Sequence, residues 1–174
     1  MLRRPSARDC DDFLSLIETS RRSHRQWVDP PADEEEFHGW VRRGRRPDFE
    51  GFLVCVADSG DIAGVTNLGQ ILRGGFQNAY LGYYGFIPTA RQGYMVEGVR
   101  LTLKHAFTTL ALHRVEANIQ PDNARSIALI ERCGFRREGF SPRYLKIGGR
   151  WRDHVRYAIT VEDWRRHKAG RSQE

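Results

Sequence analysis

Residues 90–107 read ARQGYMVEGVRLTLKHAF, and this stretch sets the frame for the rest of the chain. Apolar residues recur every three or four positions from Tyr94 onwards, which predicts a helix from Tyr94 to about residue 110. The strand-like run before it ends at Pro88, so a tight turn around Gly93 connects a strand to a helix. Such a turn exposes the unpaired amides at the helix start and suits an anion, although one glycine before a helix also fits a plain turn.

Upstream of this turn, the pattern predicts two helices and three strands. Ser6, with Asp9 three residues later, forms a capping-box pattern, and Pro30 and Pro31 separate two amphipathic segments. Three β-rich runs follow, and the turn SGD joins the first two into a hairpin. The expected elements are helices at about 7–20 and within 29–44, and strands within 51–58, 62–71 and 78–88.

Downstream of the helix, strand and helix patterns alternate again. Residues 113–120 alternate apolar and polar side chains, as a strand does. Asn123 stands where the next helix would be capped, and Gly134 followed by Phe135 predicts a Schellman ending for that helix. Two last strands lie within 138–160 and join at a Gly-Gly turn.

The order of these elements predicts an α/β (α+β) fold in which helices flank a mixed central sheet. A length of 174 residues and a hydrophobic content of 40% suit one domain over 1–174, with the last several residues disordered. No apolar run reaches the roughly 18 residues of a membrane span, and the N-terminus lacks the apolar core of a signal peptide. We therefore expect a soluble cytoplasmic protein.

The cysteines, the histidines and the net charge indicate which kinds of site the chain is expected to lack. The three cysteines are widely separated and the six histidines show no ligand-like spacing, so we expect neither a disulfide framework nor a metal site. The net charge of +6 includes arginine clusters at 21–25 and 42–46, which fit phosphate-rich partners and fit solvated helix faces equally well. Basic residues with interleaved aromatics, as in RNA-binding modules, do not stand out, so specific nucleic-acid binding is not expected.

Three stretches together resemble the GNAT superfamily of acetyl-CoA-dependent N-acetyltransferases, and within it the RimJ/RimL type that acetylates ribosomal-protein N-termini. They are GYMVEGVRLTLKHAF (93–107), LHRVEANIQPDNARSIALIERCGFRREG (112–139) and YLKIGGRWRDHVRYAIT (144–160). The features that agree in order and spacing are Gly93-Tyr94 with Glu97, Asn123 with Ser126, Gly134-Phe135, and Gly149, Trp151, Asp153 and Tyr157. The resemblance covers essentially the whole chain and implies the GNAT fold, with two central strands splayed apart.

The resemblance implies a site for acetyl-CoA as the acyl donor. Backbone groups near Phe86 and Ile87 would pair with the pantetheine arm in the gap between the splayed strands, and one amide there would stabilise the oxyanion. The turn would hold the pyrophosphate. The implied cofactor-binding residues are Phe86, Ile87, Arg91, Gln92, Gly93, Tyr94, Met95, Asn123 and Ser126.

The turn departs from the superfamily pattern Q/R-x-x-G-x-G/A at two positions. Ala90 replaces the usual Gln or Arg, and Met95 replaces the second Gly or Ala. Arg91 therefore offers the basic side chain from the next position, and the bulk of Met95 is expected to crowd the pyrophosphate.

The resemblance also implies catalytic roles for Ser126, Glu116 and Tyr144. Ser126 would donate a proton to the departing thiolate. Glu116 would be the base, with an ion pair as its alternative role, and Tyr144 would lie on the acceptor side, with plain packing as its alternative. Trp151 would pack in the core or along the substrate, while Asp153 has a turn-stabilising role as its alternative to an acceptor contact.

The implied activity is the direct attack of a primary amine on acetyl-CoA. A protein N-terminal α-amine is the expected acceptor, because its pKa of about 8 demands less of a base than a lysine does. A ribosomal protein would suit the basic chain. A small amine or an antibiotic is the alternative acceptor, a non-catalytic acyl-CoA sensor is the alternative function, and the oligomeric state is open.

Overall fold

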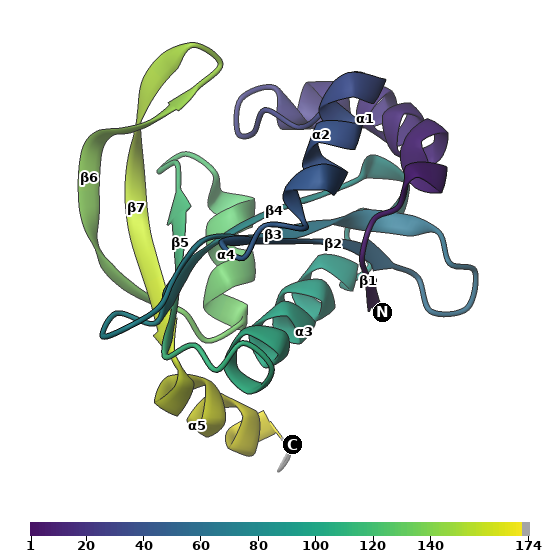
Figure 1. Cartoon of the computed structure of the whole chain (residues 1–174). Helices are drawn as coiled ribbons and strands as arrows, with labels where there is room; N and C mark the ends of the chain where they lie inside the picture. The colour runs from purple at the N-terminus through teal and green to yellow at the C-terminus, as the bar shows by residue number, and fades with distance from the viewer. Residues whose placement is uncertain (172–174) are drawn as a thin grey trace.

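The computed structural model describes residues 1–171, whose strands form one mixed sheet (Figure 1). The strands are β1 Leu2–Arg3, β2 Phe49–Cys55, β3 Ile62–Leu72, β4 Asn78–Gly85, β5 Arg114–Ile119, β6 Arg136–Ile147 and β7 Arg150–Thr160. Their order across the sheet is β1-β2-β3-β4-β5-β7-β6. Only β4 and β5 are parallel neighbours among these strands, and the other pairs are antiparallel.

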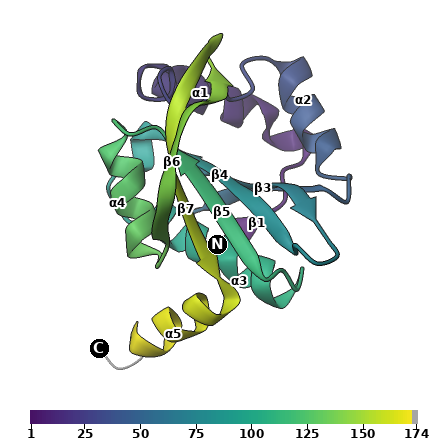
Figure 2. The same ribbon diagram turned by 90° about the vertical axis from the view of Figure 1, so that its left-hand side faces the viewer.

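Helices cover both faces of this sheet. They are α1 Cys10–His24, α2 Glu34–Arg43, α3 Tyr94–Thr108, α4 Ala124–Arg132 and α5 Val161–Arg171, and short 3-10 turns span Ala7–Asp9 and Ile87–Thr89. Figures 1 and 2 show α1 and α2 on one side of the sheet and α3 on the other. The expected α/β architecture is therefore confirmed.

Local signals at the ends of the elements are also confirmed. Asp33, which the sequence pattern did not single out, caps α2 by accepting a hydrogen bond from the Glu36 amide at 2.9 Å. At the end of α4, Gly134 takes a φ of 90° and the Phe135 amide donates to the Ile130 carbonyl at 3.2 Å, which is the Schellman geometry. The two glycines between β6 and β7 both take positive φ values, as a tight hairpin turn requires.

Three features of the fold were not predicted. α1 runs four residues beyond the expected end, to His24. β1 is only two residues long and becomes visible through its pairing with β2. α5 lacks an apolar stripe and is anchored by Trp164, whose ring centroid lies 5.4 Å from that of Phe107. The disorder expected for the last residues concerns 172–174, which lie outside the described residues, whereas 161–171 are helical.

The two parallel strands separate after a short paired segment. β4 pairs with β5 only from Asn78 to Tyr80, although it continues to Gly85. β5 instead pairs along its full length with β7 on its other side. This confirms the expected splay. The side of residues 83–87 that β5 has left is called the open edge below.

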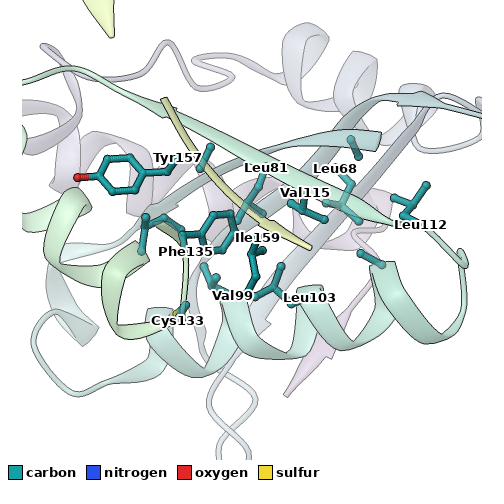
Figure 3. Packing of buried hydrophobic residues seen from close by; sticks show 14 of the residues in the cluster. Leu68, Leu81, Val99, Leu103, Leu112, Val115, Cys133, Phe135, Tyr157 and Ile159 are labelled. Atoms are coloured by element: carbon teal, nitrogen blue, oxygen red, sulfur yellow. The ribbon is translucent and has the colours of Figure 1, made fainter. Parts of the chain in front are cut away.

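Two apolar clusters hold the helices against the sheet. In the cluster of Figure 3, Val99 and Leu103 of α3 pack on Val115 of β5 and Ile159 of β7. On the other face, Phe13 of α1 lies in a cluster with residues of α2, β2 and β3 and with Phe86. α3 packs closely on the sheet at Gly98, where the absence of a side chain leaves room for Val54. A Cβ added at Gly98 would lie 2.5 Å from a Val54 methyl carbon. This packing positions the start of α3 beside the open edge.

Candidate active site

The turn before α3 presents backbone amides. Gly93 is the N-cap residue with a φ of 84°, and Arg91 also takes a left-handed φ of 64°. The Glu97 amide donates to the Gly93 carbonyl at 3.1 Å, so the amides before it in this helix have no intrahelical acceptor. Arg91 is exposed and forms no ion pair within residues 1–171. Gln92 is exposed as well, and its amide lies 3.5 Å from the Pro88 carbonyl.

The side chain of Met95 is directed at the sheet. A Cβ added at Gly64 of β3 would lie 2.2 Å from the Met95 sulfur, and one added at Gly85 would lie 2.9 Å from its Cγ. The two glycines thus provide the room that this long side chain occupies. This placement weighs against the expectation that Met95 crowds the pyrophosphate, because its bulk is accommodated over β3 and β4.

The backbone groups of Phe86 and Ile87 already have partners. The Phe86 amide donates to the Ala63 carbonyl of β3 at 2.9 Å, and the Ile87 amide donates to Ser20 Oγ at 3.0 Å. Their carbonyls accept bonds from the 3-10 turn that follows. Backbone groups alternate in direction along an antiparallel strand, so those of Gly85 face the side that β5 has left. Because the Gly85 carbonyl lies 2.8 Å from His24 Nε2, the backbone group still available here is the Gly85 amide, one residue earlier than expected.

Asn123 and Ser126 meet at the start of α4. Asn123 Oδ1 accepts a hydrogen bond from the Ser126 amide at 3.2 Å, which confirms the expected cap. The Ser126 hydroxyl lies 2.5 Å from the hydroxyl of Tyr83, which also donates to the Ser126 carbonyl at 3.0 Å. Tyr83 comes from β4, so this pair bridges β4 and α4.

Sequence reasoning missed Tyr83. Burial raises the pKa of its phenol above the ordinary value, and the bond with Ser126 opposes that shift. A tyrosine within an apolar strand needs a partner for its hydroxyl, which is the one signal in the sequence that pointed to such a contact.

Glu116 lies where β4 and β5 are still paired. Its side chain is buried, and its carboxylate accepts from Arg114 Nε at 3.0 Å. Arg114 also binds Glu138, which in turn binds Arg136. The structure therefore supports the ion-pair role for Glu116, as part of a charge network rather than as a free carboxylate.

Tyr144 belongs to a polar cluster on the same face of the sheet as Glu116. Burial, Glu116 and a hydrogen bond with Tyr144 raise the pKa of Tyr80, with burial the largest cause. The Tyr144 ring centroid lies 5.9 Å from that of His154, whose side chain is buried. Tyr80 and His154 were not recognised from the sequence, because strand pairing is what brings them to Tyr144.

Burial lowers the pKa of His154 below its ordinary value. At acidic pH the unfolded chain therefore binds more protons at this histidine than the folded chain does. The free energy of unfolding should fall as the pH drops below about 6.5. His154→Asn keeps a donor for the Arg152 carbonyl, which His154 Nδ1 contacts at 3.0 Å. We expect the wild type to lose more unfolding free energy than this variant between pH 7 and pH 5, by up to about 1.4 kcal/mol per pH unit. Urea denaturation at several pH values tests this, and parallel profiles would contradict it.

The segment after α1 touches both the end of β5 and the β6–β7 hairpin. Gln120 donates to the Gln26 carbonyl at 2.8 Å, and the Gly148 amide donates to Asp29 at 3.0 Å. Figure 1 shows the hairpin extending on the side of the sheet that carries α1. These contacts connect the loop at 25–33 to the face that carries Tyr144.

Three further residues are placed by the structure. Trp151 is 63% exposed, so it does not pack in the core, and its alternative place along the substrate stays a prediction. Asp153 accepts from the Arg143 amide at 2.7 Å, which supports its turn-stabilising role. Cys133 is buried in the apolar cluster of α3 and α4, as a small hydrophobic residue would be.

Comparison with known proteins identifies the family. Residues 1–136 match the family model described as acetyltransferase (GNAT) domain. The chain belongs to the GNAT family. It is an acetyl-CoA-dependent N-acetyltransferase, and its splayed sheet and the turn before α3 are the GNAT elements described above.

Individual relatives refine this placement. The GNAT chain is 40% identical over 166 residues to the [ribosomal protein uS5]-alanine N-acetyltransferase of Escherichia coli (strain K12), covering 90% of this chain and 85% of that protein. It is 33% identical to the probable N-acetyltransferase YjcK of Bacillus subtilis (strain 168), covering 88% and 77%. The structure of Mycobacterium smegmatis RimJ in complex with CoA-disulfide superposes with a TM-score of 0.85, at 26% identity, covering 97% of this chain and 88% of that one.

No helix within residues 1–171 combines the length and apolar character that crossing a membrane requires. Within the same residues, His, Cys, Asp and Glu side chains do not gather in groups of three or more that could hold a metal ion.

Proposed function

We propose that this N-acetyltransferase acetylates the N-terminal α-amine of a protein, with a ribosomal protein as the acceptor class. The observation that carries this proposal is the 40% identity, across 90% of the chain, with an enzyme that acetylates the N-terminal alanine of ribosomal protein uS5. The net charge of +6 agrees with an acceptor that sits in an RNA-rich particle.

Acetyl-CoA supplies an acetyl group activated as a thioester. The free amides at the start of α3, from Gly93 to Met95, would hold its pyrophosphate, with Arg91 and Gln92 adding side-chain contacts. The open edge would pair with the pantetheine arm through the Gly85 amide, since the Gly85 carbonyl is bound by His24 and the amides of Phe86 and Ile87 already have acceptors. The residues present therefore fit coenzyme A.

Ser126 is the proposed hydrogen-bond donor to the departing sulfur. A phenol has a single proton, so when Tyr83 donates to the Ser126 carbonyl, the Ser126 hydroxyl must donate to the Tyr83 oxygen. If Tyr83 turns its proton to Ser126 Oγ, the serine proton is released towards the open edge. Burial raises the pKa of Tyr83, so its phenol stays protonated. Tyr83 therefore orients the Ser126 hydroxyl and is not itself the acid.

Deprotonation of the acceptor needs little from the protein. A free α-amine has a pKa of about 8, so a sizeable fraction is neutral near pH 7.5 and water can take the remaining proton. Glu116 would act as base only after releasing Arg114, and we favour the route through water. Tyr144, together with Tyr80 and His154, would contact the acceptor.

The test is acetyl-CoA turnover, followed as released thiol, with three acceptors. One is a peptide that begins with the N-terminal alanine of uS5, the second is the same peptide with a blocked N-terminus and a free lysine, and the third is a polyamine. The proposal expects turnover with the first peptide and little with the others. Faster turnover with the polyamine or the lysine would overturn it.

A further inference from the structure

Two buried polar side chains of α1 contact the open edge. Ser20 is 0% exposed and His24 is 5% exposed, and they lie four residues apart, on one face of the helix. His24 Nε2 lies 2.8 Å from the Gly85 carbonyl oxygen, and Ser20 Oγ accepts from the Ile87 amide at 3.0 Å. The two contacts bracket Phe86.

The hydrogen bond to the Gly85 carbonyl determines which nitrogen of the His24 ring carries the proton. A carbonyl oxygen can only accept, so His24 Nε2 must carry the proton. Nδ1 is buried and has no partner within residues 1–171. The remaining ring surroundings are aromatic, with centroids of Tyr84 at 5.2 Å and Phe86 at 5.8 Å. An apolar side chain would fit these rings equally well, so packing alone does not explain a histidine here.

Gly85 lies where the ladder to β5 has ended. Its backbone groups face the side that β5 has left, so no neighbouring strand in the sheet pairs with its carbonyl. A partly buried carbonyl without a partner destabilises the conformation that exposes it. His24 supplies the missing donor from one face of the sheet, while Met95 fills the space beside Gly85 from the side of α3.

We propose that His24 and Ser20 are positioning residues that keep the open edge in its splayed form before acetyl-CoA binds. The inference rests on the proposed binding of the pantetheine arm along this edge. Because the edge is already ordered in the free protein, the binding of coenzyme A loses no free energy to ordering it. Removing the His24 donor should therefore weaken coenzyme A binding more than it slows turnover of the bound complex.

The experiment compares His24→Leu, which removes the donor, with His24→Gln, whose side-chain amide can still donate to the Gly85 carbonyl. Calorimetry gives the Kd of coenzyme A, and released thiol gives kcat at saturating acetyl-CoA. His24→Leu is expected to raise the Kd about 10-fold and to change kcat less than about threefold, whereas His24→Gln stays within about threefold of the wild-type Kd. Ser23→Ala is the matched control, because Ser23 lies on the same helix and donates only to the Ser20 carbonyl at 2.7 Å.

Each outcome separates this inference from the proposed function. If the wild type does not bind coenzyme A, the proposed site fails, and the inference fails with it. If the wild type binds and His24→Leu binds equally well while melting at a lower temperature, His24 is a packing residue and the inference is overturned. Should His24→Leu not fold, Ser20→Ala carries the test, with an expected rise of about threefold to fivefold in Kd. An unchanged Kd in that variant would overturn the inference.

Discussion

Ser126→Ala is expected to lower kcat about 100-fold while coenzyme A still binds with nearly its wild-type Kd. The hydroxyl of Ser126 lies at the start of α4 and is oriented by Tyr83 at 2.5 Å. Its loss removes the donor that would stabilise the departing sulfur, an interaction that forms only as the thioester bond breaks. The cap of α4 survives, because Asn123 accepts from the backbone amide of residue 126 and not from its side chain.

The measurement is single-turnover and steady-state release of thiol, with calorimetry for coenzyme A. Tyr83→Phe is the informative companion, since it keeps Ser126 but removes the hydroxyl that orients it, and a loss of about 10-fold is expected. Ser59→Ala, in the exposed turn between β2 and β3, is the matched control. A kcat for Ser126→Ala within threefold of the wild type would refute the assignment of Ser126 as donor.

Gly93→Asp is expected to raise the Kd of coenzyme A about 50-fold, which corresponds to about 2.3 kcal/mol. A Cβ added at Gly93 meets no atom within 4 Å, so the side chain has room. The φ of 84° is one that Asp and Asn adopt more readily than other residues. A carboxylate at this helix start repels a phosphate bound there. The left-handed φ strains any side chain at this position, so some loss of stability is expected in addition to the loss of binding.

Gly93→Asn separates the charge from the shape. It has the same size and the same tolerance of a left-handed φ, so we expect it to raise the Kd only a few-fold. The gap between the two variants should narrow as the salt concentration rises, because mobile ions screen the repulsion. Calorimetry at low and high salt, with thermal melting to verify folding, gives the answer. Equal affinities for the Asp and Asn variants would mean that the pyrophosphate does not bind at this turn.

Much of the fold was predictable because its signals are local. The Schellman ending at Gly134, the cap at Asn123 and the strand–turn–helix unit around Gly93 each depend on the conformational preferences of a few neighbouring residues. The two elements that were not predicted, β1 and α5, lack such local signals. β1 exists through pairing with β2, and α5 is held by contacts with distant residues, among them the Trp164–Phe107 ring contact and the Asp163–Arg136 ion pair.

The candidate site was predictable only in outline. Ser126 and the turn before α3 were identified, but the partner of Ser126 was not, since Tyr83 lies 43 residues away in the chain. For Glu116 the sequence leaves a base and an ion pair as alternatives, and its bond with Arg114 supports the ion pair. The direction of the Met95 side chain, which bears on whether it crowds the pyrophosphate, could not be predicted, because the glycines that accommodate it belong to other elements.

Local patterns were enough to predict the strand–turn–helix unit, the helix ends and the resemblance to the GNAT superfamily, because these depend on neighbouring residues and on motifs in a fixed order. The backbone groups that remain available at the open edge could be identified only from long-range contacts. The Ile87 amide is bound by Ser20 and the Gly85 carbonyl by His24, 61 residues away in the chain. Those hydrogen bonds arise from packing α1 across β4, and no local pattern in either segment records which donor will meet which acceptor.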